Sequence, residues 1–419
     1  MNPALRAADI LLPQVEEPEK WAVIACDQYT GQPEYWERVA EAVGSADSAL
    51  KLILPEVYLE EEDAAARIAA IHGEMDRLLA AGRFREVKNT LVYIERTLAD
   101  GAVRQGILGA IDLEEYDYRK GSVSQVRATE ATVEGRLPAR IAIREGAALE
   151  LPHILMLIDD EAKSVIEPCA ALASEGEPLY DFPLMEGGGR IRAYPIPETE
   201  RERIFVALGE LGDEAGFDRR YGLNGAPPLL FAVGDGNHSL AAAKEFYERL
   251  KRDRPGEDLS AHPARYALAE IVNLHSPALE FEAIHRIVKR VDPRLLIEEM
   301  TEALGLSEQP GEQRFTLVLP DGEREYTIGK PTSALTVGSL QNFLDDFRRR
   351  HGGKIDYIHG ANVVRTLSKR PDAVGFLLPD MKKSELFPTV IKDGALPRKT
   401  FSMGRAEDKR FYIESRRIK

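Results

Sequence analysis

The sequence predicts an α/β protein (α+β mixed) with a mixed central sheet and flanking helices. Helical and strand-like segments alternate along most of the 419 residues, and several short apolar runs bounded by Pro or Gly are typical of buried strands. Hydrophobic residues make up 44% of the chain and charged residues 30%. That balance is typical of a globular protein with room for two or three domains.

The first expected region, residues 1–120, is an N-terminal α/β layer. A proline at position 33 favours a helix start there, because its fixed φ suits a first helical turn, and Gly82 favours a helix end. The periodicity of apolar residues predicts helices over 33–43 and 59–81 and strands over 21–26, 50–54, 90–94 and 103–111.

Two further regions, 121–290 and 291–419, complete the expected division, although the chain can equally form one continuous unit because no linker stands out. The second region is predicted to contain strands over 154–158, 227–233, 266–274 and 281–288, a hairpin pairing 179–184 with 190–194, and a helix over 240–250. The third is predicted to contain helices over 293–304, 339–350 and 361–368, a hairpin over 315–328 and a strand over 374–378.

Charge and composition exclude several classes of protein. A formal net charge of −15 makes nucleic acid an unlikely partner, since non-specific binding needs many cations at the phosphates. Residues 381–419 differ, with 11 Lys and Arg against 5 Asp and Glu, so this basic end is either a solvated tail or a cover for an anionic ligand. The absence of a long apolar run and of a signal-peptide pattern predicts a cytoplasmic protein with no membrane partner. Cys26 and Cys169 have no metal-ligand spacing, and Cys26 is read as a core thiol.

The best candidate active site is the segment Gly234–Lys244, which an apolar run enters and a helical pattern leaves. Glycines at such a turn allow a ligand to approach the backbone just before the amides of a helix start, a place that favours phosphate. Asp235 and His238 are the candidate catalytic groups there, since a histidine titrates near neutrality. The structural alternative is that Asp235 or Ser239 caps the helix and His238 only bonds a carbonyl group.

Other polar segments are candidate parts of the same site. Arg127 and Thr129 are candidate anion ligands, and Glu130 is a candidate base or Mg²⁺ ligand, although a helix cap with a solvent-facing arginine stripe explains the segment equally well. Strand alternation places His285 and Arg286 on opposite faces, so at most one of them lines a given pocket. Arg398 and Lys399 follow a proline and form a plausible clamp, with a basic edge strand as the alternative.

These segments together, in consistent order over most of the chain, resemble the bacterial and archaeal family named domain of unknown function 1015. The turn Asp235-Gly236-Asn237-His238-Ser239 also looks like the phosphate-binding motif of the ParB and sulfiredoxin superfamily, which includes free serine kinases. That resemblance implies a ParB/sulfiredoxin-like element, with phosphate contacts from Gly236, Asn237, His238 and the Ser239 amide. Ser239 stands where many family members have arginine, so the missing cation must come from elsewhere, for example from Arg127 or Arg398.

The resemblance implies a phosphate-handling enzyme, such as a nucleotide-dependent, serine-like small-molecule kinase or a related phosphotransferase. ATP or ADP with Mg²⁺ are then the expected cofactors, and a small phosphorylated or anionic metabolite is the expected partner. A non-catalytic module that binds a nucleotide or metabolite is the alternative. Nuclease or DNA-partitioning chemistry is disfavoured by the charge.

Overall fold

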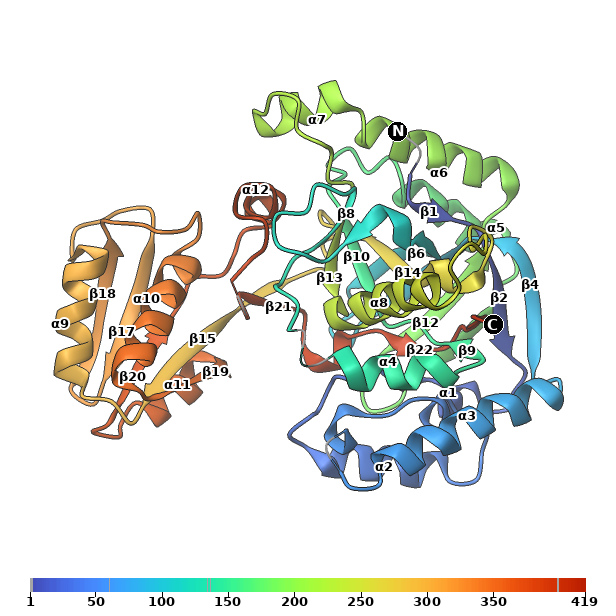
Figure 1. The fold of residues 1–419 in the computed structure, drawn as a ribbon, viewed down its shortest axis with the longest axis horizontal. Coiled ribbons are helices and arrows are strands. Elements are labelled where there is room, and N and C mark those ends of the chain that lie inside the picture. The colour runs from blue at the N-terminus through green and yellow to red at the C-terminus, as the bar shows by residue number, and fades with distance from the viewer. Residues whose placement is uncertain (1–2, 60, 134, 136, 398) are drawn as a thin grey trace. The chain divides into compact units, whose positions relative to one another are not determined.

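The computed structural model describes residues 3–59, 61–133, 135, 137–397 and 399–419, and backbone contacts group the chain into two compact units (Figure 1). The first unit comprises residues 1–279 and 404–419, and the second comprises residues 280–403. The last sixteen residues therefore return to the first unit. This division differs from the three regions expected above, because local sequence patterns carry no information about such a return.

The first unit is built on a sheet of ten strands among the described residues. Its order is β11 (Tyr180–Pro183), β12 (Arg190–Pro195), β5 (Val92–Thr97), β6 (Val103–Asp112), β14 (Tyr266–Asn273), β10 (Leu155–Ile158), β13 (Phe231–Asp235), β8 (Val126–Ala128) and β7 (Tyr116–Asp117), with β1 (Leu5–Arg6) beside β6. Most neighbours are antiparallel, whereas β10 and β14, β13 and β8, and β7 and β8 run parallel. The predicted mixed sheet is therefore confirmed.

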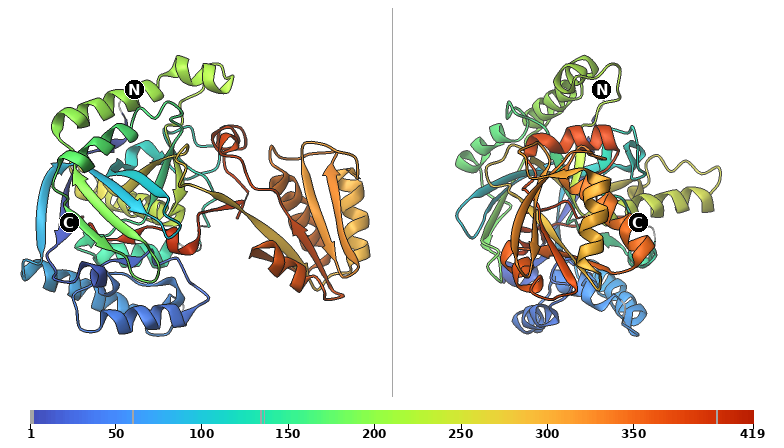
Figure 2. Two further views of the ribbon diagram at one scale, coloured as in Figure 1. Left: turned by 180° about the vertical axis from the view of Figure 1, so that it is seen from behind. Right: turned by 90° about the vertical axis from the view of Figure 1, so that its left-hand side faces the viewer.

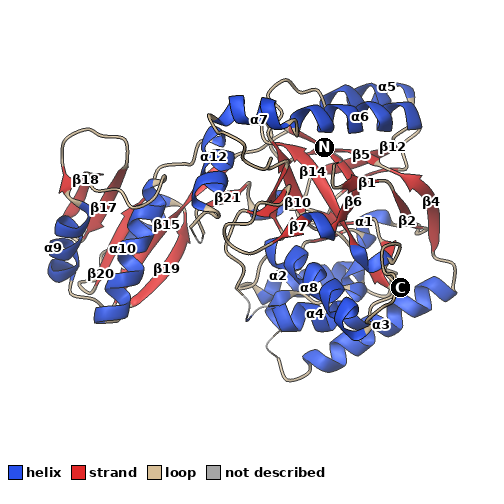
Figure 3. Cartoon of the chain, turned by 45° about the horizontal axis from the view of Figure 1, so that its top comes forward, coloured by secondary structure: helices blue, strands red, loops and turns tan. Residues whose placement is uncertain are grey.

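Helices cover both faces of this sheet (Figures 1 and 2). Strand alternation sends Val92 and Leu108 to a core that contains residues of α2 (Pro33–Val43) and α3 (Ala64–Ala80), while Tyr93 and Ile107 face a core with α6 (Glu198–Leu211) and α8 (Asn237–Asp253). The remaining helices are α1 (Pro18–Trp21), α4 (Leu137–Gly146), α5 (Leu172–Glu175) and α7 (Glu214–Tyr221). Figure 3 shows α4 lying beside α8, and the two helices share buried apolar contacts.

The C-terminal segment pairs with the N-terminal part of the first unit. Three two-stranded ladders combine β2 (Ala8–Pro13) with β4 (Phe84–Thr90), β3 (Val23–Ile24) with β22 (Phe411–Tyr412), and β9 (Leu149–Glu150) with β23 (Arg416–Arg417). Two of these ladders use strands from the last sixteen residues. Chain segments nearly four hundred residues apart in sequence thus become neighbours.

The second unit has its own sheet. Its strand order is β16 (Leu306–Ser307), β18 (Gly322–Ile328), β17 (Arg314–Leu319), β20 (Ala373–Leu377), β15 (Phe281–Lys289) and β19 (Lys354–His359). The short strand β21 (Phe401–Met403) pairs with the start of β15. Its helices are α9 (Pro293–Leu304), α10 (Thr336–His351), α11 (Ala361–Leu367) and α12 (Lys383–Asp393). The contacts pack α9 against α10 and place α11 against the sheet.

Most predicted elements are confirmed, including helices α2 and α9 with the predicted bounds and the hairpin of β11 and β12. The strand predicted over residues 50–54 is wrong. Residues Ala49–Leu52 form a short 3₁₀ helix instead. Ser48 caps its start, because the Ser48 hydroxyl accepts a hydrogen bond from Leu50 N at 3.2 Å. A capping serine and the turn's own packing outweigh the apolar run there.

Candidate functional site

The turn between β13 and α8 has a backbone that only glycine adopts easily. Gly236 has φ of +80° and is the residue that precedes the first helical position. A Cβ atom added at Gly236 would lie only 3.1 Å from the Ile154 backbone. In α8 the first intrahelical bond is donated by Leu240 N to Gly236 O (3.0 Å), so the amides of residues 237–239 lie ahead of the helical ladder. Such amides, with the helix dipole, form an environment for an anion.

A register shift in β13 turns Asp235 to a different face of the sheet from Val233. Asp235 pairs with Leu155, whereas Val233 pairs with Met156, so Gly234 is the additional residue of a β-bulge. Residues paired across strands point to the same face. Since Glu270 of β14 also pairs with Leu155, Asp235 shares its face with Glu270. The bulge thus directs the carboxylate toward the side of the sheet where the C-terminal segment lies.

Lys409, from the C-terminal segment, meets Asp235 at this turn. Its Nζ lies 3.3 Å from Asp235 Oδ2, and the side chains are only 9% and 16% exposed. The other carboxylate oxygen, Oδ1, accepts a hydrogen bond from Gly236 N at 3.1 Å. A nearly buried lysine therefore stands beside the N-terminal turn of α8, at a position that no local pattern marks.

Asp27 follows shortly after β3, and its carboxylate interacts electrostatically with Lys409. Burial alone would raise the pKa of Asp27, but electrostatic interaction with His153, a hydrogen bond from Gln28 Nε2 (3.0 Å) and the charges of Lys409 and Arg140 lower it. Asp27 is therefore ionised at neutral pH, with cationic groups close to it.

The loop after β8 is fastened to the start of α8. Thr129 N donates to Asn237 Oδ1 (3.1 Å), and the Thr129 hydroxyl donates to Val233 O (2.6 Å). Further along this loop, Val133 N donates to His238 Nε2 at 3.2 Å. This bond makes Nε2 an acceptor, which corresponds to an imidazole with its proton on Nδ1. Asn237 and His238 therefore connect the helix start to the loop at residues 129–133.

Ser239 begins a chain of hydrogen bonds that runs away from the turn. Its Oγ lies 3.0 Å from His153 Nε2, and His153 Nδ1 lies 2.8 Å from the Tyr412 hydroxyl. The same hydroxyl accepts from Cys26 N at 3.2 Å. Burial and the charge of Asp27 raise the pKa of the Cys26 thiol to about 12, so this cysteine is neutral and not an activated nucleophile.

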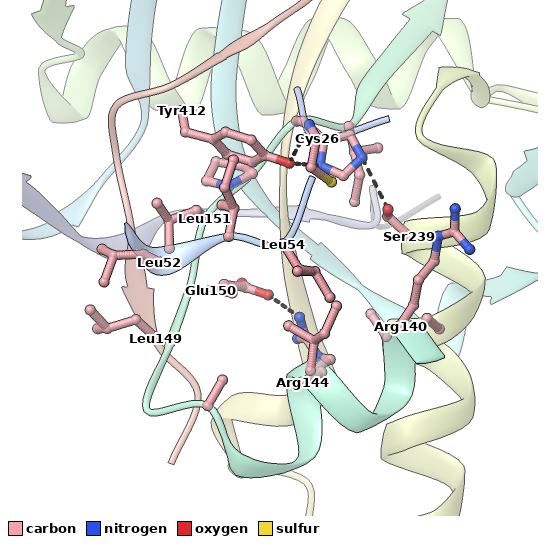
Figure 4. Close-up of a pocket in the computed structure, with 18 of the residues that line it drawn as sticks. Cys26, Leu52, Leu54, Arg140, Arg144, Leu149, Glu150, Leu151, Ser239 and Tyr412 are labelled. Atoms are coloured by element: carbon pink, nitrogen blue, oxygen red, sulfur yellow. Dashed lines mark hydrogen bonds and ion pairs between the residues drawn. The ribbon is translucent and has the colours of Figure 1, made fainter. Parts of the chain in front are cut away.

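A cavity of about 140 Å³ adjoins this chain of hydrogen bonds (Figure 4). Ser239, His153, Cys26 and Tyr412 contribute to one part of its wall. Aliphatic side chains supply much of the remainder, among them Leu52, Leu54, Met75, Leu149, Leu151 and Leu268. Two arginine and two glutamate residues also line it, namely Arg140, Arg144, Glu56 and Glu150. A largely apolar cavity with a few convergent polar groups is the usual form of a small-molecule site.

The structure brings part of the predicted site together. Thr129, Gly236, Asn237, His238 and Ser239 meet at the start of α8, as the preceding contacts describe. Arg127 is buried, and its guanidinium donates to Ser124 O (2.8 Å) and Pro227 O (2.7 Å), while burial lowers its pKa to about 10. Glu130 is half-buried in the same loop. These residues remain site predictions.

The remaining predicted residues belong to the second unit. His285 Nδ1 accepts from Leu378 N (3.2 Å), and burial lowers the pKa of this histidine. Arg286, on the opposite face of β15, is fully buried and donates to Gln341 of α10 at 3.2 Å. Lys399 is exposed, with φ of +55°, and Arg398 lies outside the described residues. The site described here uses first-unit residues alone.

Sequence reasoning missed Asp27, His153, Lys409 and Tyr412. Each lies outside the Gly-rich motif, in a segment with no chemical signature of its own. The one available indication was the excess of basic residues near the C-terminus, to which Lys409 belongs. Their grouping depends on the pairing of β22 with β3, which local sequence patterns do not reveal.

The described residues lack two further kinds of feature. No cluster of three or more His, Cys, Asp or Glu side chains there is arranged to hold a metal ion. In the same part of the chain no helix combines the length and the apolar character that crossing a bilayer requires.

The first unit is thus a mixed α/β unit with a candidate anion site at a helix start. Residues 11–347 match the family model described as protein of unknown function (DUF1015), and the chain belongs to this family. The resemblance inferred from the sequence is confirmed. No curated protein matches the chain.

Solved structures with partial likeness include three of note. A conserved hypothetical protein from Pyrococcus furiosus has a TM-score of 0.37 at 13% identity, covering 73% of this chain and 94% of the other. SbnI with C-terminal truncation, from Staphylococcus aureus, has a TM-score of 0.36 at 10% identity, covering 71% and 82%. A free serine kinase in complex with AMP has a TM-score of 0.39 at 13% identity, covering 73% and 91%. Scores of this size establish no shared function.

Proposed function

We propose that the chain is a phosphate-handling enzyme, a nucleotide-dependent small-molecule kinase or related phosphotransferase, which binds phosphate at the N-terminal turn of α8. The observation that carries the proposal is the Asp235–Lys409 ion pair at that turn. An ammonium group beside the amides that open a helix combines two of the features by which proteins bind phosphate. Gly236 allows the phosphate to approach the backbone.

Lys409 supplies the cation that the sequence lacks at Ser239. Asp235 holds the ammonium group in place and, through its bond to Gly236 N, also fixes the turn. The side chains of Asn237 and His238 hold the loop at residues 129–133 against the helix start. In this proposal Asp235 and His238, predicted as catalytic, act as positioning residues.

Asp27 is the group that we assign to the acceptor hydroxyl. Its lowered pKa keeps it ionised, and an aspartate in this role orients the hydroxyl for in-line attack. The hydroxyl oxygen forms a bond to phosphorus, the bond from phosphorus to the leaving phosphate oxygen breaks, and the hydroxyl proton passes to Asp27. The positive charge of Lys409 stabilises the transferring group.

Mg²⁺ is compatible with these residues. Among the described residues, the buried Oδ2 of Asp235 has an ion pair but no hydrogen bond, so it retains capacity for a cation. Mg²⁺ commonly uses one or two carboxylates together with substrate phosphates, and Asp235 would be such a carboxylate. When bound, the ion would neutralise charge on the phosphates.

The experiment compares Lys409→Met with wild type by calorimetric titration with ADP, ATP and inorganic phosphate. Loss of a charge-assisted contact should weaken binding by about tenfold or more. Lys409→Arg should retain part of the affinity, and Lys88→Met, at a lysine that is 77% exposed, should bind as wild type does. The proposal fails if wild type binds none of the three, or if Lys409→Met binds them all unchanged.

A binding module without catalysis is the second candidate, and the contacts of Asn237 and His238 with the 129–133 loop favour it because they couple the turn to a neighbouring segment. Asp27→Asn separates the two functions. Turnover of ATP, followed by ³¹P NMR, should fall far more than affinity in an enzyme. In a binding module no turnover exists to be lost, and only affinity can change.

A further inference from the structure

The charges in the cavity wall cancel. Arg144 Nη1 lies 2.7 Å from Glu150 Oε2, and Arg140 is ion-paired with Glu56. All four residues line the cavity, and its other described lining residues are uncharged apart from the titratable His153 (Figure 4). A charged ligand group would lose its hydration there without a compensating partner, which is costly. The wall therefore favours an uncharged ligand.

The polar part of the wall matches one kind of functional group. The Ser239 and Tyr412 hydroxyls and the His153 ring nitrogens can each donate or accept, according to rotamer and tautomer. An alcohol hydroxyl also both donates and accepts, so it can join this chain at Ser239. A carboxylate can only accept and an ammonium can only donate, and the charged groups of this wall are already engaged with one another, Arg144 with Glu150 at 2.7 Å against 3.3 Å for Lys409 with Asp235.

The size of the cavity limits the rest of the ligand. Its volume of about 140 Å³ is close to that of an engineered apolar cavity of about 150 Å³ that binds benzene. The apolar wall, including Met75, Leu149 and Ala242, would thus enclose a body of about six non-hydrogen atoms. Each buried apolar group of that kind contributes favourably through the hydrophobic effect.

We infer that this cavity binds a small neutral alcohol, with its apolar body against the aliphatic wall and its hydroxyl at Ser239 and His153. The inference names the acceptor class of the proposed phosphotransferase and in that respect rests on the proposed function, in which Asp27, a carboxylate that interacts electrostatically with His153, receives the hydroxyl proton. Ser239 connects the two places, since its amide belongs to the α8 turn and its side chain lines the cavity.

Methyl NMR of the full chain, labelled at methionine, tests the inference with benzyl alcohol as the probe. Met75 lines the cavity and is 2% exposed, so its methyl signal should shift on titration. Benzoate and benzylamine have nearly the same size but carry a charge, and should bind at least about tenfold more weakly because of their desolvation. Equal binding of all three, or no Met75 shift with benzyl alcohol, would overturn the inference.

Two variants locate the probe within the cavity. Ser239→Ala should weaken benzyl alcohol while leaving toluene, which has no hydroxyl, bound as before. Ala242→Leu should exclude both, and its circular dichroism would show whether the fold survives. If Ser239→Ala binds benzyl alcohol as wild type does, the assigned hydroxyl position is wrong even where the larger substitution cannot be assessed.

ADP titration of the same samples keeps the two proposals separate. Benzyl alcohol binding with the expected charge preference, in a protein that does not bind ADP or phosphate, would support the cavity inference and remove the proposed phosphotransfer. ADP binding together with an unresponsive Met75 would overturn the cavity inference and leave the phosphate site standing.

Discussion

Lys409 owes its position to the backbone on which it lies. The carbonyl of the preceding Asp408 accepts from Arg104 (2.6 Å) and Arg96 (3.2 Å), and the carbonyl of Lys409 itself accepts from Arg96. Both arginines lie on strands of the large sheet, β5 and β6, and are buried. The ammonium group is thus presented to Asp235 by a rigidly bonded backbone segment, as a preorganised phosphate ligand requires.

The thiol of Cys26 should be unreactive in the native protein. Burial raises the pKa of its thiol to about 12, and burial also raises that of Cys169 to about 11. The reactive thiolate is then a minor species at about pH 8. We expect Ellman's reagent to react negligibly with the native protein over minutes and with both thiols in guanidinium chloride. Rapid reaction in the native protein that is lost in Cys26→Ser would show that Cys26 is activated.

The site was predictable at the level of residues only where the chemistry is local. The Gly-Asp-Gly turn combines a positive φ, a helix start and a carboxylate within a few residues, so the sequence indicates it directly. Asp27 and Lys409 acquire a role only when β22 pairs with β3. That pairing buries an apolar pair of strands of ordinary composition, and nothing in such short strands specifies their partner.

The turn before α8 should be sensitive to substitution of its glycine. Gly236→Ala forces a side chain into a positive φ and against Ile154, whereas Gly256→Ala meets the same φ cost in open space. We expect about 1 kcal/mol of destabilisation at Gly256 and at least about 2 kcal/mol at Gly236. Urea unfolding followed by tryptophan fluorescence measures this, because Trp21 and Trp36 both lie in the first unit. Equal effects would mean that the Ile154 contact is unimportant.

Glu150 of β9 connects three elements, because it forms ion pairs with Arg416 of β23 and Arg144 of α4. Burial raises the pKa of Glu150, but the charges of Arg416 (2.7 Å) and Arg144 (2.7 Å) outweigh it, and the net shift is below the ordinary value of 4.5. A depressed carboxyl pKa contributes stability above the unfolded value, and this contribution is lost as the pH falls through the folded value. Glu150→Gln should cost about 3 kcal/mol at neutral pH, as for a broken buried pair.

The difference in unfolding free energy between wild type and Glu150→Gln should therefore shrink as the pH falls below about 4.5. Urea titrations at several pH values give this difference directly. A difference that stays constant from neutral to acid pH would contradict the assigned ionisation. Glu86→Gln, at a carboxylate on an exposed part of β4, provides the control and should show no comparable cost.

The sequence predicts a helix or strand well when the interactions that stabilise it lie within the element itself. Helices α2 and α9 begin at a proline and have an apolar stripe, so periodicity alone locates them. The motif lies at the end of a strand as predicted, but β13 extends through Asp235 itself, and the face of Asp235 depends on the bulge opposite Leu155. A bulge depends on the partner strand, which the sequence of β13 does not contain.

At the scale of the whole molecule, the last sixteen residues complete the first unit through buried charges. Arg410 lies 2.9 Å from Glu270 and 2.8 Å from Glu414, and all three side chains are at most 3% exposed. Gly106 on β6 leaves room for Glu270, because a Cβ there would lie 2.6 Å from its Oε1. Removing one partner of a buried pair is strongly destabilising. This segment is therefore integral to the unit that holds the site.

The second unit, by contrast, should be removable. Its two connections begin with β15 and end with β21, and Phe281 pairs with Met403, so neighbouring strands bring both connections to within about 5.5 Å. We expect a chain in which a short Gly-Ser linker replaces residues 280–403 to fold and to retain the tryptophan fluorescence of the first unit. Removal of residues 404–419 should unfold that unit. A folded product of the second deletion would contradict the division into units.

Phosphate is proposed to bind at the start of α8. Amide NMR of deuterated protein, with ¹⁵N resonances assigned for residues 236–239, tests it most directly during titration with ADP. The amides of Gly236, His238 and Ser239 should shift first and together, and these shifts should be lost in Lys409→Met. Saturable ADP binding that leaves these amides unchanged, or shifts confined to another part of the chain, would contradict it.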